Sequence, residues 1–169
     1  KILDYRTDCG TFDRIVSVGM FEHVGTRNYI DYFEAIRNKL KKNGIALIHT
    51  IGRMAPPGNN SPWLDKYIFP GGYSPALSEM VASVEKNYLC ITDVEVWRLH
   101  YAKTLRHWHS RFTENEKLIR EIYGDRFCRM WRYYLISSEI SFRYYQHVVF
   151  QVQITKEQEA VPLTRNYLY

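Results

Sequence analysis

Two titratable side chains, Glu22 and His23, come directly after Phe21, which ends a largely apolar run that begins with residues 14–20 (RIVSVGM). A carboxylate and an imidazole can each accept or donate a proton, so this pair could carry out general acid–base chemistry. In open α/β sheets, ligands bind just outside the carboxyl ends of the strands. The pair is therefore a candidate site, although Glu22 taken alone could equally be a helix-start residue that complements the helix dipole.

A strand–helix–strand unit is predicted to position this pair. The β-branched run at residues 14–20 is typical of a strand covered on both faces in a parallel sheet, and residues 45–51 (IALIHTI) predict a second one. Between them, residues 28–40 carry apolar side chains at helical spacing. Asn43 and Gly44 are expected to end this helix, with Gly44 in a left-handed cap.

The topology of this unit brings a third titratable residue towards the site. A strand–helix–strand unit crosses over right-handed and lays its strands parallel, so both strands end at the same edge of the sheet. His49, at the end of the second strand, is therefore expected close to Glu22. A lone histidine on an apolar strand is more often a core residue with satisfied hydrogen bonds, so the convergence of two strand ends is what favours function.

The rest of the chain predicts a long excursion and a helical arm before a returning strand. Residues 53–72 are rich in Pro, Gly and Asn and predict an irregular segment, which is more often functional than decorative. Ser74 and Pro75 predict a cap and a first helical position for a helix that reaches about Tyr88. The remaining predicted elements are a strand at 91–99, helices at 101–112, 114–123 and 124–145, and an edge or near-edge antiparallel strand at 147–154.

This order of elements predicts an α/β fold with a mostly parallel sheet, an antiparallel last strand and inserted helices. The order matches the C-terminal half of a Rossmann-like domain. The first half, in which a glycine-rich turn holds the cofactor, is not found in these residues. Gly71 and Gly72 lie in the wrong context to replace it. We expect residues 1–156 to be part of one such domain and residues 157–169 to be a tail that is disordered or ordered only by crystal contacts. The first residues, which lack an initiator Met, suggest a fragment.

Composition limits the partners. The chain is 46% hydrophobic and 15% aromatic, enough for a real core. Its net charge of +5 suits an anionic partner, whether membrane, nucleic acid or a phosphate-bearing cofactor, although an ordinary solvated surface is the more common cause of such a charge. No run of Lys or Arg predicts nucleic-acid binding. Cys9, Cys90 and Cys128 form neither a metal pattern nor an even disulfide set, so we expect no metal and a reducing cytoplasm. No apolar stretch approaches the ~20 residues of a membrane-spanning helix.

Six separated segments together resemble one enzyme family. They are DYR (4–6), FDRIVSVGMFEHVG (12–25), HTIG (49–52), WLDKYIFPGG (63–72), YAKTL (101–105) and FR (142–143). In this order and spacing they resemble the cyclopropane-fatty-acyl-phospholipid synthases and the related mycolic acid cyclopropane synthases, over roughly residues 3–155. The resemblance implies a class I methyltransferase domain whose cofactor is S-adenosylmethionine.

The implied reaction adds a methylene group across the cis double bond of a phospholipid acyl chain to form a cyclopropane ring. In the family, a bound bicarbonate serves as the base, and the matching positions here are Glu22, His49, Ile51 and Tyr101; a further position lies outside this chain. A carboxylate can hold this anion if it accepts the bicarbonate O–H while His49 and Tyr101 donate. Taken alone, Tyr101 could also simply cap the aromatic core.

The resemblance also implies two binding regions. The residues expected to bind the cofactor form two groups. Tyr5, flanked by Asp4 and Arg6, would lie at the adenine, and Val18, Gly19 and His23 would lie along the methionine portion. The residues expected to bind the acyl chain are Leu105, Tyr134, Ser138 and Phe142, and the last three share one helix face. An ordinary core-facing stripe would give the same sequence pattern. Many relatives carry a cysteine in place of Ser138, so this serine argues against covalent catalysis there, or against activity in this protein.

The implied partner is membrane phospholipid, met from the cytoplasm at the inner face of the membrane. Residues 66–70 combine a cation with apolar side chains and could meet a lipid surface, although a buried loop is equally compatible. A homodimer is a further expectation. The alternatives are a relative that methylates without closing a ring or that methylates a small amine, and a non-catalytic lipid-binding protein.

Overall fold

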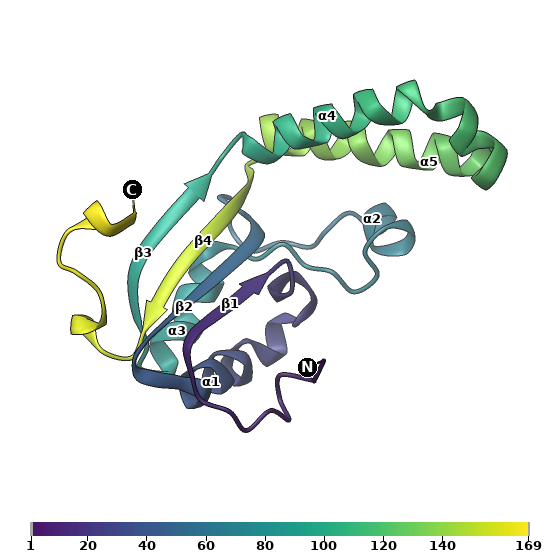
Figure 1. Cartoon of the computed structure of the whole chain (residues 1–169). Helices are drawn as coiled ribbons and strands as arrows, with labels where there is room; N and C mark the ends of the chain where they lie inside the picture. Colours follow the sequence, from purple (N-terminus) through teal and green to yellow (C-terminus); the bar gives the residue numbers. More distant parts are fainter. Residues whose placement is uncertain (1, 169) are drawn as a thin grey trace.

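The computed structural model describes residues 2–168 and shows an α/β fold (Figure 1). Its sheet has the order β1-β2-β4-β3, from β1 (Phe12–Val18), β2 (Leu40–Arg53), β4 (His147–Thr155) and β3 (Cys90–Trp97). β1 and β2 are parallel, and β4 runs antiparallel to both of its neighbours. The other three strands therefore share one direction, which confirms the predicted sheet with an antiparallel last strand.

Two helices cover one face of the sheet. α1 (Tyr29–Lys39) connects β1 to β2, and α3 (Leu77–Lys86) lies beside it (Figure 1). The apolar face of α1 packs on the sheet because its buried side chains recur at helical spacing. The resulting core contains Phe21, Tyr32, Phe33, Ile36, Met80, Val84, Ile48 and Phe150.

Two long helices extend beyond the end of the sheet as an arm. α4 (His100–Glu114) and α5 (Glu116–Tyr144) lie side by side in Figure 1, and a second core cluster that includes Leu105, Phe112 and Leu135 packs between them. α5 is interrupted at Gly124, whose φ of 80° lies in the left-handed region that glycine tolerates best. This break is where the sequence predicted one helix to end and the next to begin.

The expected helix end at Asn43 and Gly44 is wrong. α1 ends at Lys39 and β2 begins at Leu40 without an intervening loop. Gly44 lies within β2, where an added Cβ would come 2.7 Å from Cδ1 of Leu40. The glycine is therefore needed because Leu40 packs closely against its backbone. Local sequence alone does not distinguish a glycine in such a contact from a glycine in a helix cap.

The predicted cap at Ser74 and Pro75 is also wrong. α3 begins at Leu77, and Glu79 closes its first turn by accepting a hydrogen bond from the Ala76 backbone N–H at 2.8 Å. The Ser-Pro cap occurs instead at Ser61, whose hydroxyl accepts from the Trp63 N–H at 3.3 Å. It opens α2 (Pro62–Tyr67), a short helix inside the stretch that was expected to be irregular.

The C-terminal residues pack on the sheet, contrary to the expected disorder. Two short 3₁₀ helices, Gln158–Ala160 and Arg165–Leu168, form there. Arg165 pairs with Asp93 of β3 at 2.6 Å, and the Tyr167 hydroxyl accepts from Nε2 of Gln153 on β4 at 2.5 Å. These contacts reach across the chain, so segment composition did not reveal them. Among residues 2–168, no helix has the length and apolarity needed to cross a membrane.

Candidate active site

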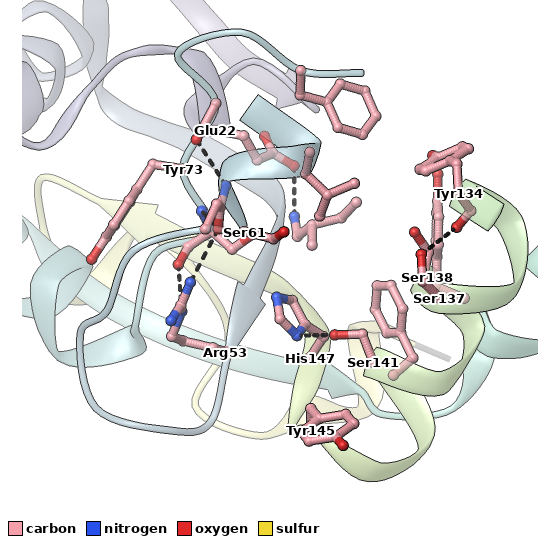
Figure 2. A pocket seen from close by; sticks show the side chains of 18 of the residues that line it. Glu22, Arg53, Ser61, Tyr73, Tyr134, Ser137, Ser138, Ser141, Tyr145 and His147 are labelled. Carbon is pink, nitrogen blue, oxygen red and sulfur yellow. Dashed lines mark hydrogen bonds between the residues drawn. The ribbon is translucent and has the colours of Figure 1, made fainter. Parts of the chain in front are cut away.

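A cavity of about 470 Å³ lies where the sheet, the 54–74 excursion and the helical arm meet. The end of β2 and the 3₁₀ turn Phe21–His23 form one wall, and α5 forms the opposite wall (Figure 2). This is the carboxyl edge of β1 and β2, where the parallel unit was expected to expose its ligand-binding groups.

Glu22 has one satisfied and one unsatisfied oxygen at this cavity. Its Oε1 accepts a hydrogen bond from the Ile51 backbone N–H at 2.7 Å, which ties the turn after β1 to the end of β2. Its Oε2 is buried and has no hydrogen-bond partner in the described part of the chain. A buried carboxylate oxygen without a donor is costly, so this atom indicates a place for a ligand that donates a hydrogen bond.

Tyr101 lines the same cavity from the first turn of α4. Burial raises the pKa of its hydroxyl above the usual value, and the nearby charge of Glu22 raises it further. Its ring stacks on Phe142 with the centroids 5.2 Å apart, which fixes its orientation. The phenol therefore stays protonated near neutral pH and can donate a hydrogen bond into the cavity.

His49 lies on β2 but outside this cavity lining. In register it pairs with Val18, the last residue of β1, whereas β2 continues to Arg53. Its Nδ1 lies 3.1 Å from Oε1 of Gln151, and its ring meets Trp97 edge-on. Of the four expected catalytic positions, the structure thus brings Glu22, Ile51 and Tyr101 to one cavity. The His49 side chain instead contacts Gln151 of the neighbouring strand β4.

The expected cofactor residues fall into two groups. Gly19 and His23 line the cavity, and Gly19 has a φ of 64° with nothing within 4 Å of an added Cβ, so the backbone there is open to a ligand. Val18 is 64% exposed at the end of β1. Neither Asp4, Tyr5 nor Arg6 is among the lining residues described.

The segment that holds the expected adenine residues has a defined structure of its own. Asp4 and Arg6 form an ion pair at 2.6 Å, and hydrogen bonds from Arg6 lower the pKa of Asp4 to about 2. The Tyr5 ring packs edge-on against Tyr32 of α1, with the centroids 5.8 Å apart. Tyr5 is thereby anchored to the helix that follows β1.

All four expected acyl-chain residues line the cavity. Leu105 comes from α4, and Tyr134, Ser138 and Phe142 come from α5. Phe69 of the excursion faces the Tyr134 ring with the centroids 5.8 Å apart, so the excursion closes over the apolar end. The stripe that sequence could not distinguish from a plain core is thus the wall of a hollow site.

Several lining residues were not expected from the sequence. Arg53 donates from Nε to the Ser74 carbonyl at 2.9 Å and from Nη2 to Oδ1 of Asn60 at 3.1 Å, so it holds the excursion to the end of β2. His147 approaches Ser141 of α5, with 2.6 Å between Nδ1 and Oγ (Figure 2). The only available signal was position: Arg53 directly follows the HTIG segment, and His147 opens the last strand. The antiparallel register that pairs the two is a tertiary property.

The partly buried His147 predicts a pH-dependent stability. Burial lowers the pKa of His147, and the charge of Arg53 lowers it further. The unfolded chain takes up a proton near pH ~6.5 and the folded protein only at lower pH, so the free energy of unfolding should fall as pH drops below about 6.5. Urea unfolding at a series of pH values should show this fall, and His147→Asn should flatten it. An unchanged slope in the variant would contradict this assignment.

The fold places the chain in a class of methyltransferases, and the family model then identifies its family. A sheet with parallel β1 and β2 and an antiparallel β4 is the C-terminal fold of class I S-adenosylmethionine-dependent methyltransferases. Coclaurine N-methyltransferase shares this fold with a TM-score of 0.74 at 20% identity, over 92% of this chain and 52% of its own. The chain belongs to the mycolic acid cyclopropane synthase family. The family model, "Mycolic acid cyclopropane synthetase", matches residues 1–152.

Individual relatives agree with this membership. The cyclopropane-fatty-acyl-phospholipid synthase of Escherichia coli K12 is 40% identical over 156 residues, which are 92% of this chain and 41% of the relative. Tuberculostearic acid methyltransferase UfaA1 of Mycobacterium tuberculosis is 35% identical, over 92% of this chain and 38% of its own length. The cyclopropane synthase MmaA2 of Mycobacterium tuberculosis superposes with a TM-score of 0.80 at 26% identity, over 89% of this chain and 57% of its own. This chain thus spans about two fifths of the length of the curated relatives.

Proposed function

We propose that the protein containing this chain adds a methylene group from S-adenosylmethionine across the cis double bond of a phospholipid acyl chain, which gives a cyclopropane ring. The observation that carries the proposal is the buried, unpartnered Oε2 of Glu22 at a cavity whose lining as a whole is mainly apolar. A carboxylate beside an acyl-sized apolar cavity suits a reaction that develops positive charge on a hydrocarbon. The E. coli relative, a cyclopropane-fatty-acyl-phospholipid synthase, supports the substrate class.

The residues of the chain account for binding and orientation in this reaction. An alkene is a poor nucleophile, so it must be held in line with the donor methyl in a site that excludes water. Leu105 and Phe142 line the cavity and would orient the acyl chain, and the excursion would exclude water by closing at Phe69. The aromatic faces and the Glu22 carboxylate favour a carbocation over its neutral precursor.

S-adenosylmethionine fits the edge of the sheet near β1. The positive φ of Gly19 and the open space around it allow a ligand to approach the backbone closely, and His23 lines the same region. We propose that Gly19, His23 and Val18 lie along its methionine portion, and that Asp4, Tyr5 and Arg6 lie near the adenine. When bound, S-adenosylmethionine supplies the electrophilic methyl group. The complex of the cyclopropane synthase CmaA1 with SAH supports this cofactor class.

Bicarbonate fits the polar end of the cavity in part. Oε2 of Glu22 lacks the donor that a bicarbonate O–H would provide, and the protonated Tyr101 hydroxyl can donate to such an anion. The Ile51 N–H is already used by Oε1 of Glu22, so in this chain it would orient the carboxylate instead of the anion. When bound, bicarbonate would supply the base for the proton of the transferred methyl group. We propose His49 as a further donor to it.

We also propose that the protein meets the membrane peripherally from its cytoplasmic side, through the arm. At the far end of α4 and α5, the apolar side chains of Leu118, Ile122 and Tyr123 are exposed. The same segment exposes cations, Lys117 and Arg126, and acids, Glu121 and Asp125. Exposed apolar side chains in a segment that also carries cations suit a lipid surface. The 66–70 segment adds the exposed rings of Tyr67 and Phe69. A homodimer is a separate proposal, for which size-exclusion chromatography with light scattering is the test.

The reaction is tested by its products. The full-length protein should be incubated with methyl-labelled S-adenosylmethionine and vesicles of a cis-monounsaturated phospholipid, and the acyl chains then analysed by mass spectrometry and NMR. We expect a gain of one CH2 per labelled chain with cyclopropane proton signals. A methyl-branched or methylene product without a ring would instead indicate a methyltransferase that does not close the ring. Tight lipid binding without any label transfer would indicate a non-catalytic lipid-binding protein.

A further inference from the structure

Three polar side chains form a continuous chain across three neighbouring strands. His49 lies on β2, Gln151 on β4 and Glu95 on β3, and the strand register places Gln151 opposite both of the others. Nδ1 of His49 lies 3.1 Å from Oε1 of Gln151, and Nε2 of Gln151 donates to Oε2 of Glu95 at 2.8 Å. The chain of contacts lies beside the cavity, because Ile51 follows His49 on the same face of β2.

The direction of the Gln151 amide follows from its neighbour on β3. An ionised carboxylate only accepts hydrogen bonds, so the amide nitrogen of Gln151 must face Glu95. Hydrogen bonds from the side chains of Trp97 and Gln151 lower the pKa of Glu95, which keeps this carboxylate ionised. The amide oxygen is therefore left to face His49, and the two ends of Gln151 cannot exchange without losing both contacts.

The amide oxygen in turn decides where His49 carries its proton. An amide oxygen only accepts, so Nδ1 of His49 must be the donor. The imidazole ring is held in its plane by the edge-on contact with Trp97, at 5.8 Å between centroids. The nitrogen left for a ligand is Nε2, which accepts a hydrogen bond in the neutral ring and donates one in the charged ring.

We propose that Gln151, oriented by Glu95, is a positioning residue that holds His49 as its Nδ1–H tautomer and so presents Nε2 to the reacting groups. The inference rests on the proposed function, in which His49 takes part in catalysis. It adds two residues from two further strands to that site. Partners that orient metal-bound histidines in this way cost about 10- to 100-fold in activity when they are removed, and we expect an effect of the same order for this histidine.

The test combines turnover with a direct measurement of the tautomer. In full-length protein labelled with ¹⁵N-histidine, two-bond ¹H–¹⁵N spectra should show the neutral His49 ring with its proton on Nδ1. Gln151→Leu removes the acceptor at similar volume, so the ring should shift towards the Nε2–H form. We expect kcat to fall about 10- to 100-fold in this variant while the affinity for S-adenosylmethionine stays unchanged.

A swapped pair serves as the matched control. In the double variant Glu95→Gln with Gln151→Glu, the new amide donates to the new carboxylate, whose other oxygen still accepts from His49. This variant should keep the Nδ1–H tautomer and most of the activity. Should Gln151→Leu fold poorly, loss of both properties in a folded double variant would contradict the positioning role.

Two results would overturn different claims. An unchanged tautomer or undiminished kcat in Gln151→Leu, with His49→Ala inactive, would refute the positioning role and leave the proposed function standing. Full turnover in His49→Ala would instead refute the catalytic role of His49 on which the inference rests.

Discussion

Glu22→Gln in the full-length protein is expected to lower turnover by at least about 100-fold while the affinity for S-adenosylmethionine stays close to that of the parent. Glutamine is nearly the same size as glutamate, and its oxygen can still accept the Ile51 N–H that Oε1 accepts at 2.7 Å. The change therefore keeps the link between the turn after β1 and the end of β2. It replaces the unpartnered Oε2 acceptor with an NH2 donor.

This variant separates a catalytic from a structural role for Glu22. If Oε2 receives a hydrogen bond from a ligand in the reaction, an NH2 group at that place repels the ligand's donor and removes the negative charge. If Glu22 only ties β1 to β2, activity should survive, because that contact is kept. Turnover and cofactor titration on the same preparation give the two readouts, with the exposed Glu85→Gln as a charge-matched control. Parental turnover in Glu22→Gln would refute the proposed site.

Gly52→Ala is expected to destabilise the fold by about 3 kcal/mol, although it adds a single methyl group. An added Cβ would lie 2.5 Å from Cε2 of Phe150 and 2.7 Å from the Pro75 carbonyl oxygen. The ring is fully buried, and the carbonyl already accepts the Arg53 N–H at 2.9 Å, so neither can move freely. This glycine lets the chain after the excursion close against the end of β2.

Urea unfolding of the parent and the variant measures this loss. Gly10→Ala is a matched control, because its Cβ would come 2.7 Å from the Phe12 ring, which is partly exposed and free to swing away. We expect that control to lose less than about 1 kcal/mol. In Gly52→Ala with Phe150→Leu, the smaller side chain should relieve part of the strain, so the two effects should not add. Equal stability of Gly52→Ala and the parent would show that Pro75 yields at no cost.

Local patterns were sufficient for most of the elements in this chain. The strand runs, the helical spacing of α1 and the break at Gly124 are short-range signals, because each reflects a repeat or a backbone preference within a few residues. The expectation that the first run is covered on both faces is wrong, because β1 is an edge strand of this sheet and Val16 is 66% exposed. The errors at Gly44 and Ser74 have one cause. A glycine in a tight contact and a Ser-Pro pair in a loop look the same locally as helix punctuation, and only packing against Leu40, or the capping of α3 by Glu79, distinguishes them.

The sequence by itself determined the α/β order of the elements, the resemblance to one methyltransferase family and the residue types of the candidate site, because these depend on composition and local spacing. Only the tertiary structure decided how those residues meet. It turned the stripe at Leu105, Tyr134, Ser138 and Phe142 into a cavity wall, left Oε2 of Glu22 without a donor, and aligned His49 with Gln151 and Glu95. These contacts join strands and helices far apart in the chain, and a one-residue change of strand register would turn His49, Gln151 or Glu95 to the opposite face of the sheet.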